Sequence, residues 1–284
     1  MIPPILVSVV ITTYNRSDAL LAVLEGLSLQ TDTDFEVVVA DDGSKEEHVT
    51  ALAQSPLARF LNVVHVWHPD IGFTASRIRN RGVSASRGNY IIFVDGDCVP
   101  ETDFIARHKA LAAPGCFLNG SRVLLSDCLT RQATQGGERL TGRSMAYWIK
   151  QRIMGNANKL SGPVRLPDWR GRMDRGVAWT RVRSCNMAVW RTDFERIDGF
   201  DESFVGWGHE DADFVLRLDH AGVLRKNGFF ATEVFHLWHK EVVRTQASQN
   251  AATVSQRALT NITLPTLGYA QHRPNDDAVI TRLG

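Results

Sequence analysis

The sequence has no apolar run long enough to cross a membrane, since none of its hydrophobic stretches approaches about 18 residues. No basic stretch or small-residue cleavage site flanks its first apolar run, so no signal peptide is expected. The four cysteines form no C-x-x-C pair, which predicts free thiols in a reducing compartment. Together these absences predict a cytoplasmic protein.

An excess of charge of one sign is also missing. The 284 residues include 32 Lys and Arg against 31 Asp and Glu, a formal net charge of +1. Nucleic-acid-binding proteins usually carry a basic excess, so no nucleic-acid partner is expected. Hydrophobic residues make up 44% of the chain, which is enough for the core of one large α/β domain.

The N-terminal part of the chain alternates strand and helix patterns. Short apolar runs typical of buried strands cover residues 7–12, 35–40, 63–67 and 90–94. One helix between them is predicted to begin with a cap at Ser17 or Asp18, and another to cover residues 75–86. This alternation predicts an α/β fold with a mostly parallel central sheet flanked by helices on both faces.

Polar residues follow three of these predicted strands, at residues 13–16, 41–44 and 95–97. In parallel sheets, ligands bind at the carboxyl ends of the strands. Three polar clusters at one edge therefore predict a binding site there.

The most informative cluster is Asp95, Gly96 and Asp97, because two carboxylates end an otherwise apolar run. Hard oxygen ligands beside a residue without a side chain suit a divalent cation, Mn²⁺ or Mg²⁺, that also holds a diphosphate. Residues 98–100 are expected to break the strand behind the triplet. The alternative interpretation of the triplet is an ordinary acidic turn.

A second acidic cluster places Glu210, Asp211 and Asp213 in the first turn of a predicted helix. Acids there can simply complement the helix dipole. The preceding loop, with Trp207 between two glycines, indicates instead an aromatic ring that closes over a sugar, beside a carboxylate placed as a general base.

A third polar group ends the strand-like run 234–239, which contains His236 and His239. Neutral imidazole binds Mn²⁺ and similar ions, so one of these histidines could complete a metal site with the acidic triplet. A purely structural histidine is the alternative.

In order and spacing, these motifs resemble family 2 glycosyltransferases of the GT-A fold, the nucleotide-diphospho-sugar transferase fold, with a C-terminal segment similar to that of galactosyltransferases. The resemblance runs from about residue 8 to residue 239. It implies a metal-dependent, inverting hexosyltransferase of polysaccharide biosynthesis. Such an enzyme moves a sugar from a nucleotide-diphosphate donor, with UDP expected, to a hydroxyl of a glycan or lipid-linked saccharide.

The resemblance also implies roles for single residues. Those expected to bind the nucleotide sugar are Thr13, Tyr14, Arg16, Asp42, Arg79, Asp95, Gly96 and Trp207. Asp97 is expected to bind the metal directly, with Asp95 nearer the ribose and His236 as a further ligand (His239 as the alternate). Asp211 is expected to be the base and Glu210 to orient the acceptor.

Two further positions bear on the resemblance. Residues 184–186 are expected near the donor sugar, and Cys98 replaces the Asp or Ser that many members carry after the triplet. Three other activities remain open: a retaining transferase, a nucleotidyltransferase and an inactive carbohydrate-binding protein. A nucleotidyltransferase usually needs a Gly-rich loop near its N-terminus, which residues 12–16 do not provide, and an inactive protein would have lost the acids.

We expect a transferase domain over 1–244, with a nucleotide-binding half (1–100) and an acceptor-binding half (101–244), and a tail over 245–284. An insertion or lid is expected over about 126–180.

Within that insertion, a helix over 145–154 is basic and carries Trp148. It could lie on a membrane surface, although packing onto the domain is favoured. The tail is expected to form a helix over 246–259 followed by extended chain. The sequence does not indicate an oligomeric state.

Overall fold

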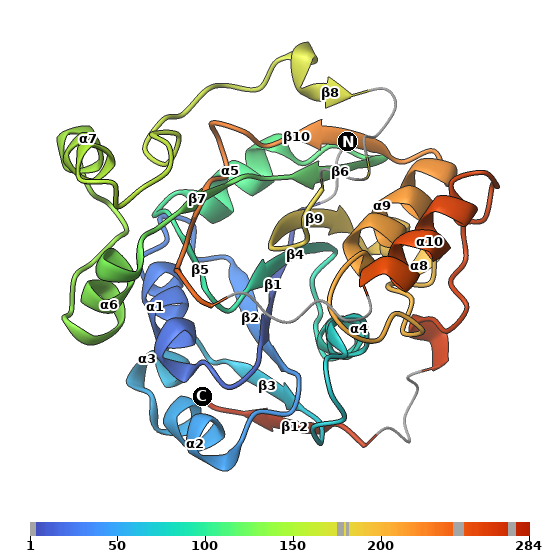
Figure 1. Ribbon diagram of the computed structural model, residues 1–284, viewed down its shortest axis with the longest axis horizontal. Helices are drawn as coiled ribbons and strands as arrows, with labels where there is room; N and C mark the ends of the chain where they lie inside the picture. Colours follow the sequence, from blue (N-terminus) through green and yellow to red (C-terminus); the bar gives the residue numbers. More distant parts are fainter. Residues whose placement is uncertain (1–3, 175–178, 180–181, 241–246, 272–276) are drawn as a thin grey trace.

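The computed structural model describes residues 4–174, 179, 182–240, 247–271 and 277–284. Within them the chain forms a twisted sheet between two layers of helices (Figure 1). Nine described strands lie in the order β12-β3-β2-β1-β4-β9-β6-β10-β8. Their bounds are β1 Val7–Thr13, β2 Phe35–Asp41, β3 Val64–Trp67, β4 Tyr90–Asp95, β6 Cys116–Asn119, β8 Met173–Asp174, β9 Asn186–Trp190, β10 Leu224–Asn227 and β12 Val279–Arg282.

The central strands β3, β2, β1 and β4 run parallel, and β9 joins β4 in the antiparallel direction. Valine and isoleucine fill these strands because helices cover both faces. One face carries α1 (Ser17–Ser28), α2 (Glu46–Gln54), α3 (Pro56–Phe60) and α5 (Phe104–Leu111). The other carries α4 (Ala75–Ser84), α8 (Arg191–Arg196) and α9 (Glu210–His220). The predicted α/β fold is therefore confirmed.

Two predicted helix boundaries are wrong. Arg16, and neither Ser17 nor Asp18, is the residue that precedes α1, and no side chain caps this helix. The Ser17 hydroxyl lies instead 2.9 Å from Nδ1 of His48 in α2, so it is engaged in tertiary packing. The helix predicted to reach residue 86 ends at Ser84.

A second sheet begins directly after the acidic triplet. Its strands, β5 (Cys98–Pro100), β11 (Val234–His236) and β7 (Arg122–Leu124), lie in the order β5-β11-β7. The preceding strand does end before residues 98–100, as predicted, but these residues also form a strand of their own, which was not predicted. Since β11 pairs with β5 and places His236 opposite Cys98, this sheet carries a distant histidine to the triplet.

The region expected to be an insertion contains α6 (Asp127–Gln135) and α7 (Met145–Ile153), at the left of Figure 1. The predicted helix over 145–154 is confirmed. Its Trp148 is buried and stacks on Phe235, with 4.1 Å between ring centroids, so this side chain packs onto the domain as favoured.

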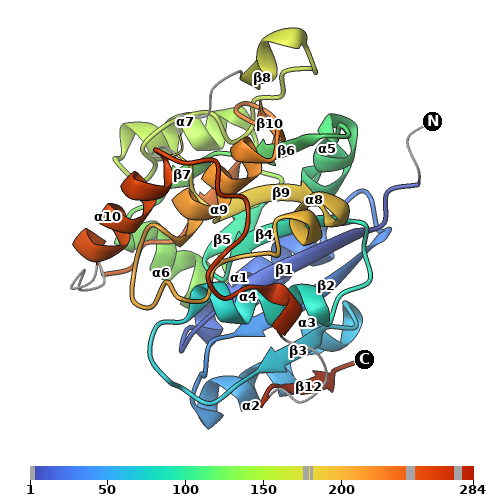
Figure 2. The ribbon, with the colours of Figure 1, turned by 90° about the vertical axis from the view of Figure 1, so that its right-hand side faces the viewer.

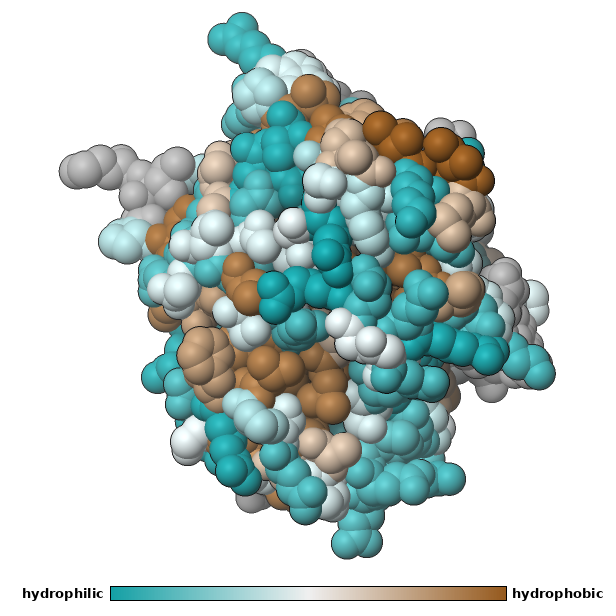
Figure 3. Space-filling model, turned by 90° about the vertical axis from the view of Figure 1, so that its left-hand side faces the viewer, coloured by the Kyte–Doolittle hydropathy of each residue, from teal (hydrophilic) through white to brown (hydrophobic). Residues whose placement is uncertain are grey.

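The outer face of α7, unlike the buried face with Trp148, exposes apolar side chains. Four apolar side chains on and just after the helix are 40–81% exposed: Met145, Ile149, Ile153 and Met154. Figure 3 shows apolar residues gathered on the side of the molecule that carries this helix. No helix in the described part of the chain is both long and apolar enough to span a bilayer.

The end of the chain returns to the domain (Figure 2). The predicted helix over 246–259 is present as α10 (Ala247–Arg257), although residue 246 lies outside the described residues. Val254 of α10 packs against Leu216 of α9. The extended chain that follows contains β12, which pairs antiparallel with β3 and forms an edge of the main sheet.

Candidate active site

The three predicted polar clusters meet at the carboxyl edge of the parallel strands. The Asp42 amide donates to the Thr13 carbonyl (2.9 Å), and the Gly96 amide donates to the Thr12 carbonyl (2.7 Å). A Cβ atom at Gly96 would lie 3.0 Å from the Thr13 Cβ, so glycine allows this close approach. The clusters therefore form one continuous surface.

Asp42 is buried and holds the loop that follows β3. Its carboxylate accepts hydrogen bonds from the Thr74 amide (2.8 Å) and hydroxyl (2.5 Å), and Nε2 of His68 lies 3.1 Å away. The carboxylate expected near the nucleotide base therefore also fixes the loop beside that position.

Tyr14 and Arg16 are more open than Asp42. Tyr14 is 47% exposed, and its hydroxyl donates to Asp70 (2.8 Å), which raises its pKa because the phenol proton is held by the carboxylate. Arg16 pairs with Asp18 at 2.9 Å. Both side chains keep hydrogen-bonding capacity for a ligand, since the Arg16 guanidinium has further N–H groups and the Tyr14 hydroxyl can still accept.

Asp97 lies beside both candidate histidines. Its Oδ1 is 3.7 Å from Nε2 of His236, and its Oδ2 is 3.4 Å from Nε2 of His239. The Cys98 sulfur, which the sequence did not suggest as a ligand, belongs to the same cluster: ligand atoms of Asp97, Cys98 and His236 lie within 4.8 Å of one another. Burial lowers the pKa of His236 and favours the neutral imidazole that binds metals. The carboxylate and the imidazole suit a Mn²⁺-like ion, whereas the Cys98 thiol does not, since burial raises its pKa and soft sulfur ligands suit other metals.

Arg79 links the acidic triplet, through Asp95, to the second acidic cluster, through Glu210. Its buried guanidinium lies 3.2 Å from Asp95 and 3.3 Å from Glu210. Burial disfavours the charge, but the two carboxylates outweigh it and raise the pKa of Arg79. Arg79 thus connects the acidic triplet to Glu210, which lies 131 residues after Arg79 in the sequence. A direct contact between Arg79 and a phosphate stays a prediction.

Asp211 begins α9 beside Glu210 and is buried. Burial raises its pKa to about 7, and the neighbouring Glu210 carboxylate adds to this effect, while Arg183 and Arg79 oppose it. A carboxylate with a pKa near neutrality is suited to accept a proton.

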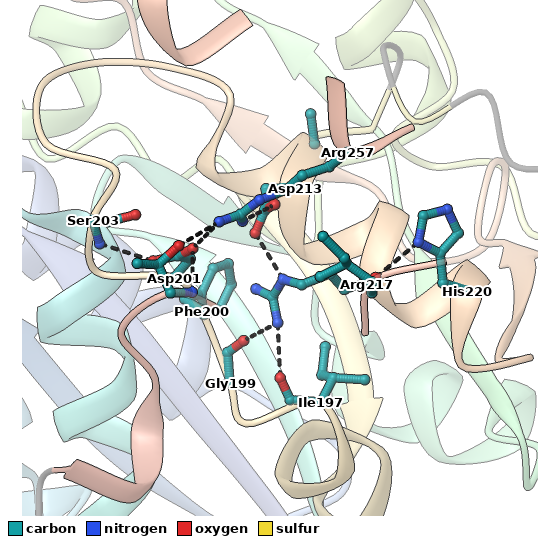
Figure 4. Close-up of polar contacts among 12 residues, drawn as sticks. Ile197, Gly199, Phe200, Asp201, Ser203, Asp213, Arg217, His220 and Arg257 are labelled. Carbon is teal, nitrogen blue, oxygen red and sulfur yellow. Dashed lines mark hydrogen bonds and ion pairs between the residues drawn. The ribbon is translucent and has the colours of Figure 1, made fainter. Parts of the chain in front are cut away.

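The third acid of this helix, Asp213, has a structural role. It is fully buried between Arg217 (2.8 Å) and Arg257 (2.5 Å), and Arg257 also donates to Asp201 at 2.7 Å. Figure 4 shows Arg217 reaching the carbonyls of Ile197 and Gly199, each at 2.8 Å. This network anchors α9 to the loop before it and to α10, so the structural alternative holds for Asp213.

The loop with Trp207 precedes α9 in an unusual backbone conformation. Gly206, Gly208 and His209 all have positive φ, of 80°, 104° and 72°. The half-buried Trp207 ring therefore sits between two positions that favour glycine. The Gly206 amide donates to the Phe73 carbonyl (3.0 Å), which joins this loop to the one held by Asp42.

A pocket of about 270 Å³ adjoins the site and was missed in the sequence. Residues 184–186 were expected near the donor sugar. Of these, Cys185 lines the pocket, and Asn186 is buried and donates to the Ser121 carbonyl at 3.0 Å. Other lining residues include Asn119, Arg122, Arg183, Arg225 and Phe229. They come from separate segments, and no motif joins them in the sequence.

Two protein families match the chain. Glycosyl transferase family 2 matches residues 8–141, and the N-terminal domain of galactosyltransferase matches residues 172–240. Chondroitin synthase of Escherichia coli is 29% identical over 76% of this chain and 32% of that protein. Validoxylamine A glucosyltransferase of Streptomyces hygroscopicus is 28% identical over 77% of this chain and 52% of that protein. The chain therefore spans about a third to a half of these relatives.

Solved structures share the fold. S. aureus TarS 1–349 in complex with UDP-GlcNAc gives a TM-score of 0.59 at 16% identity, over 93% of this chain and 68% of that one. The mannosyltransferase PcManGT from Pyrobaculum calidifontis, in complex with GDP-Man and Mn²⁺, gives 0.54 at 18% identity, over 84% and 59%. The fold resembles that of GT-A glycosyltransferases. The family matches therefore identify residues 8–141 as a family 2 glycosyltransferase segment and residues 172–240 as a segment of the galactosyltransferase type, on a fold that these solved structures share.

Proposed function

We propose that this protein transfers a sugar from a UDP-linked donor to a hydroxyl of a glycan or lipid-linked saccharide, with inversion at the anomeric carbon. One observation carries the proposal. Arg79 connects Asp95 of the acidic triplet to Glu210, which lies directly beside Asp211 and its pKa of about 7. Groups suited to a leaving diphosphate and to a reacting hydroxyl are thus close together.

In this proposal Asp97 and His236 hold a divalent cation, Mn²⁺ or Mg²⁺, with Asp95 directed toward the ribose and His239 as the alternate histidine. The support is that ligand atoms of Asp97 and His236 belong to one cluster, with 3.7 Å between Oδ1 and Nε2. When bound, the cation offsets the charge that develops on the leaving diphosphate.

Asp211 then acts as the base. It removes the proton from the acceptor hydroxyl while that oxygen forms a bond to the anomeric carbon, and the bond from this carbon to the UDP oxygen breaks. Glu210 orients the acceptor. Arg79 forms ion pairs with both Glu210 and Asp95 and so holds the two carboxylates at a fixed distance from each other. A single displacement of this kind inverts the configuration.

The remaining predicted residues complete the donor site. Thr13, Tyr14, Arg16 and Asp42 are proposed to surround the nucleotide beside Gly96, and Trp207 to cover the sugar. The support is their position around one edge of the sheet, with Trp207 on a loop that contacts the loop fixed by Asp42.

We also propose that the outer face of α7 contacts an anionic membrane surface. Its exposed stripe of Met145, Ile149 and Ile153 is accompanied by exposed Lys150 and Arg152, a combination that binds at lipid headgroups. Such contact would bring the enzyme to lipid-linked acceptors. The four free cysteines support a reducing, cytoplasmic side of that membrane.

The direct test uses the purified protein with Mn²⁺ and a panel of nucleotide sugars and acceptors. We expect acceptor-dependent release of UDP, and an inverted anomeric proton signal in the NMR spectrum of the product. Asp211→Asn should lower kcat by about 100-fold or more and leave donor binding by calorimetry nearly unchanged. Retention of configuration, or collapse of donor binding in this variant, contradicts the assignment.

A further inference from the structure

The pocket that Cys185 lines is strongly basic. Arg122, Arg183 and Arg225 all line it, and no acidic side chain is among the described residues that do. The pocket lies between the two sheets, because Arg122 begins β7 of the small sheet and Arg225 lies in β10 of the large one. Its third arginine precedes β9, which pairs with the metal-side strand β4.

The location of this pocket points to the acceptor. Cys185 in its wall receives a hydrogen bond from Arg122 (3.8 Å) and adjoins the Cys98 thiol next to Asp97. On the other side, Arg183 is close enough to Asp211 to oppose the rise in its pKa. The strand register places the pocket near the acidic triplet, because Cys185 precedes Asn186, which pairs with Val94, and Arg122 pairs with Val234 on the strand of His236. A group in the pocket would therefore lie near the metal-side cluster of Asp97 and His236.

Two of these arginines are incompletely hydrogen-bonded, although the burial of Arg122 is outweighed by Cys185, Cys98, Asp95 and Asp97, which raise its pKa. Arg122 has only a sulfur acceptor, which is weak, and no described carboxylate lies within ion-pair distance of it. Arg225 is held by Asp174 (3.2 Å) and by the Asn119 amide oxygen (3.2 Å), yet its buried Nε has no hydrogen-bond partner. A buried donor without a partner is costly unless a ligand supplies the acceptor.

The rest of the lining suits a sugar. Phe229 is 37% exposed and offers a flat face to a pyranose ring, and Asn227 and Ser121 offer hydrogen-bonding groups. One face of the Phe229 ring is covered by Lys159, 4.9 Å from the ring centre and paired with Glu233 at 3.3 Å, which leaves the other face for a sugar. Guanidinium groups bind carboxylates and phosphates in a bidentate manner that a neutral hydroxyl does not match.

We propose that the acceptor carries an anionic group, a carboxylate or a phosphate, close to the hydroxyl that receives the sugar, and that Arg122 and Arg225 bind this group. The proposal rests on the proposed transferase function and specifies its acceptor. A carboxylate would come from a uronic acid, and a phosphate from a lipid diphosphate or a phosphorylated glycan.

The test compares kcat/KM for matched acceptors at saturating donor: a β-glucoside, the corresponding β-glucuronide, and a short-chain lipid diphosphate sugar. We expect one anionic acceptor to be preferred over the glucoside by about ten-fold or more, the size of one charge-assisted hydrogen bond. The preferred acceptor identifies the source of the charge. Arg122→Gln should reduce this preference to about three-fold or less, whereas Arg131→Gln, a change of an exposed arginine on α6, should retain it.

Equal use of neutral and anionic acceptors overturns the inference and leaves the transferase function intact. The inference is also overturned if Arg122→Gln keeps the preference for the anionic acceptor and raises the KM for the donor. In that case these arginines would bind the donor diphosphate. Absence of transfer to every acceptor, with no donor binding, removes the proposed function and this inference together.

Discussion

The raised pKa of Asp211 predicts the pH dependence of the reaction. With a pKa of about 7, about half of the molecules carry the charged base at pH 7, about nine tenths at pH 8 and about a tenth at pH 6. Because only the charged form accepts a proton, activity should rise with pH, about ten-fold per unit, below that pKa.

Glu210→Gln tests the cause of this shift. Burial is the main contribution, and the Glu210 carboxylate is the next. A neighbouring unit charge at an effective dielectric constant of about 20 shifts a pKa by about one to two units. Removing it should move the acid limb of the profile down to about pH 5–6, whatever the substitution does to the maximal rate.

The assay is kcat/KM for the acceptor between about pH 5 and pH 9, at saturating donor and Mn²⁺. Burial lowers the pKa of His236, which keeps this proposed ligand neutral over most of that range. The residual kcat/KM of Asp211→Asn should not fall with decreasing pH in the acidic part of the profile. A flat profile in the unmodified protein, or an unmoved limb in Glu210→Gln, would refute the reasoning.

Three further predictions concern the metal, the fold and the membrane. Asp97→Ala should abolish Mn²⁺-dependent donor binding in calorimetry, and full activity in EDTA would contradict the metal site. Asp213→Ala leaves the buried Arg217 guanidinium without its carboxylate and removes one of the two carboxylates that Arg257 contacts. It should destabilise the fold by about 3–5 kcal/mol in urea unfolding, and a loss below about 1 kcal/mol would contradict the network. Ile149→Glu with Ile153→Glu should abolish sedimentation with anionic liposomes and leave transfer to a soluble acceptor unchanged, and retained sedimentation would exclude α7 as the contact.

Matched controls separate these effects from general damage. Re-addition of Mn²⁺ after EDTA should restore donor binding in the unmodified protein. Asp219→Asn changes a part-exposed acid of the same helix as Asp213 and should alter stability by less than about 0.5 kcal/mol. Leu259→Glu changes a residue that is 88% exposed just after α10 and should leave liposome binding intact.

Local sequence patterns predicted the parallel strands and the polar clusters that follow them. Hydrophobic runs such as residues 90–94 indicate buried strands by composition alone, and the direction of parallel strands then brings their ends together. The helix beginning at Glu210 was predicted for the same reason, since its spacing and acidic first turn are local features.

Pairings between distant segments were not predictable. Nothing near Cys98 in the sequence indicates that its strand pairs with the strand that ends at His236. That pairing brings the histidines to Asp97. The return of β12 to the edge of the sheet and the three-arginine pocket likewise depend on contacts between distant residues. Hydrophobic periodicity describes the face of one element and contains no information about its partners.

The hydrogen bond from Gly206 to Phe73 has a consequence for the order in which the substrates bind. It connects the loop fixed by Asp42, where the nucleotide is expected, to the loop that carries Trp207. Binding of the nucleotide at the loop fixed by Asp42 should therefore set the conformation of the Trp207 loop before an acceptor can bind under the indole ring. We expect a compulsory sequence in which the nucleotide sugar enters first and UDP departs last, visible as uncompetitive inhibition of donor turnover by a dead-end acceptor analogue.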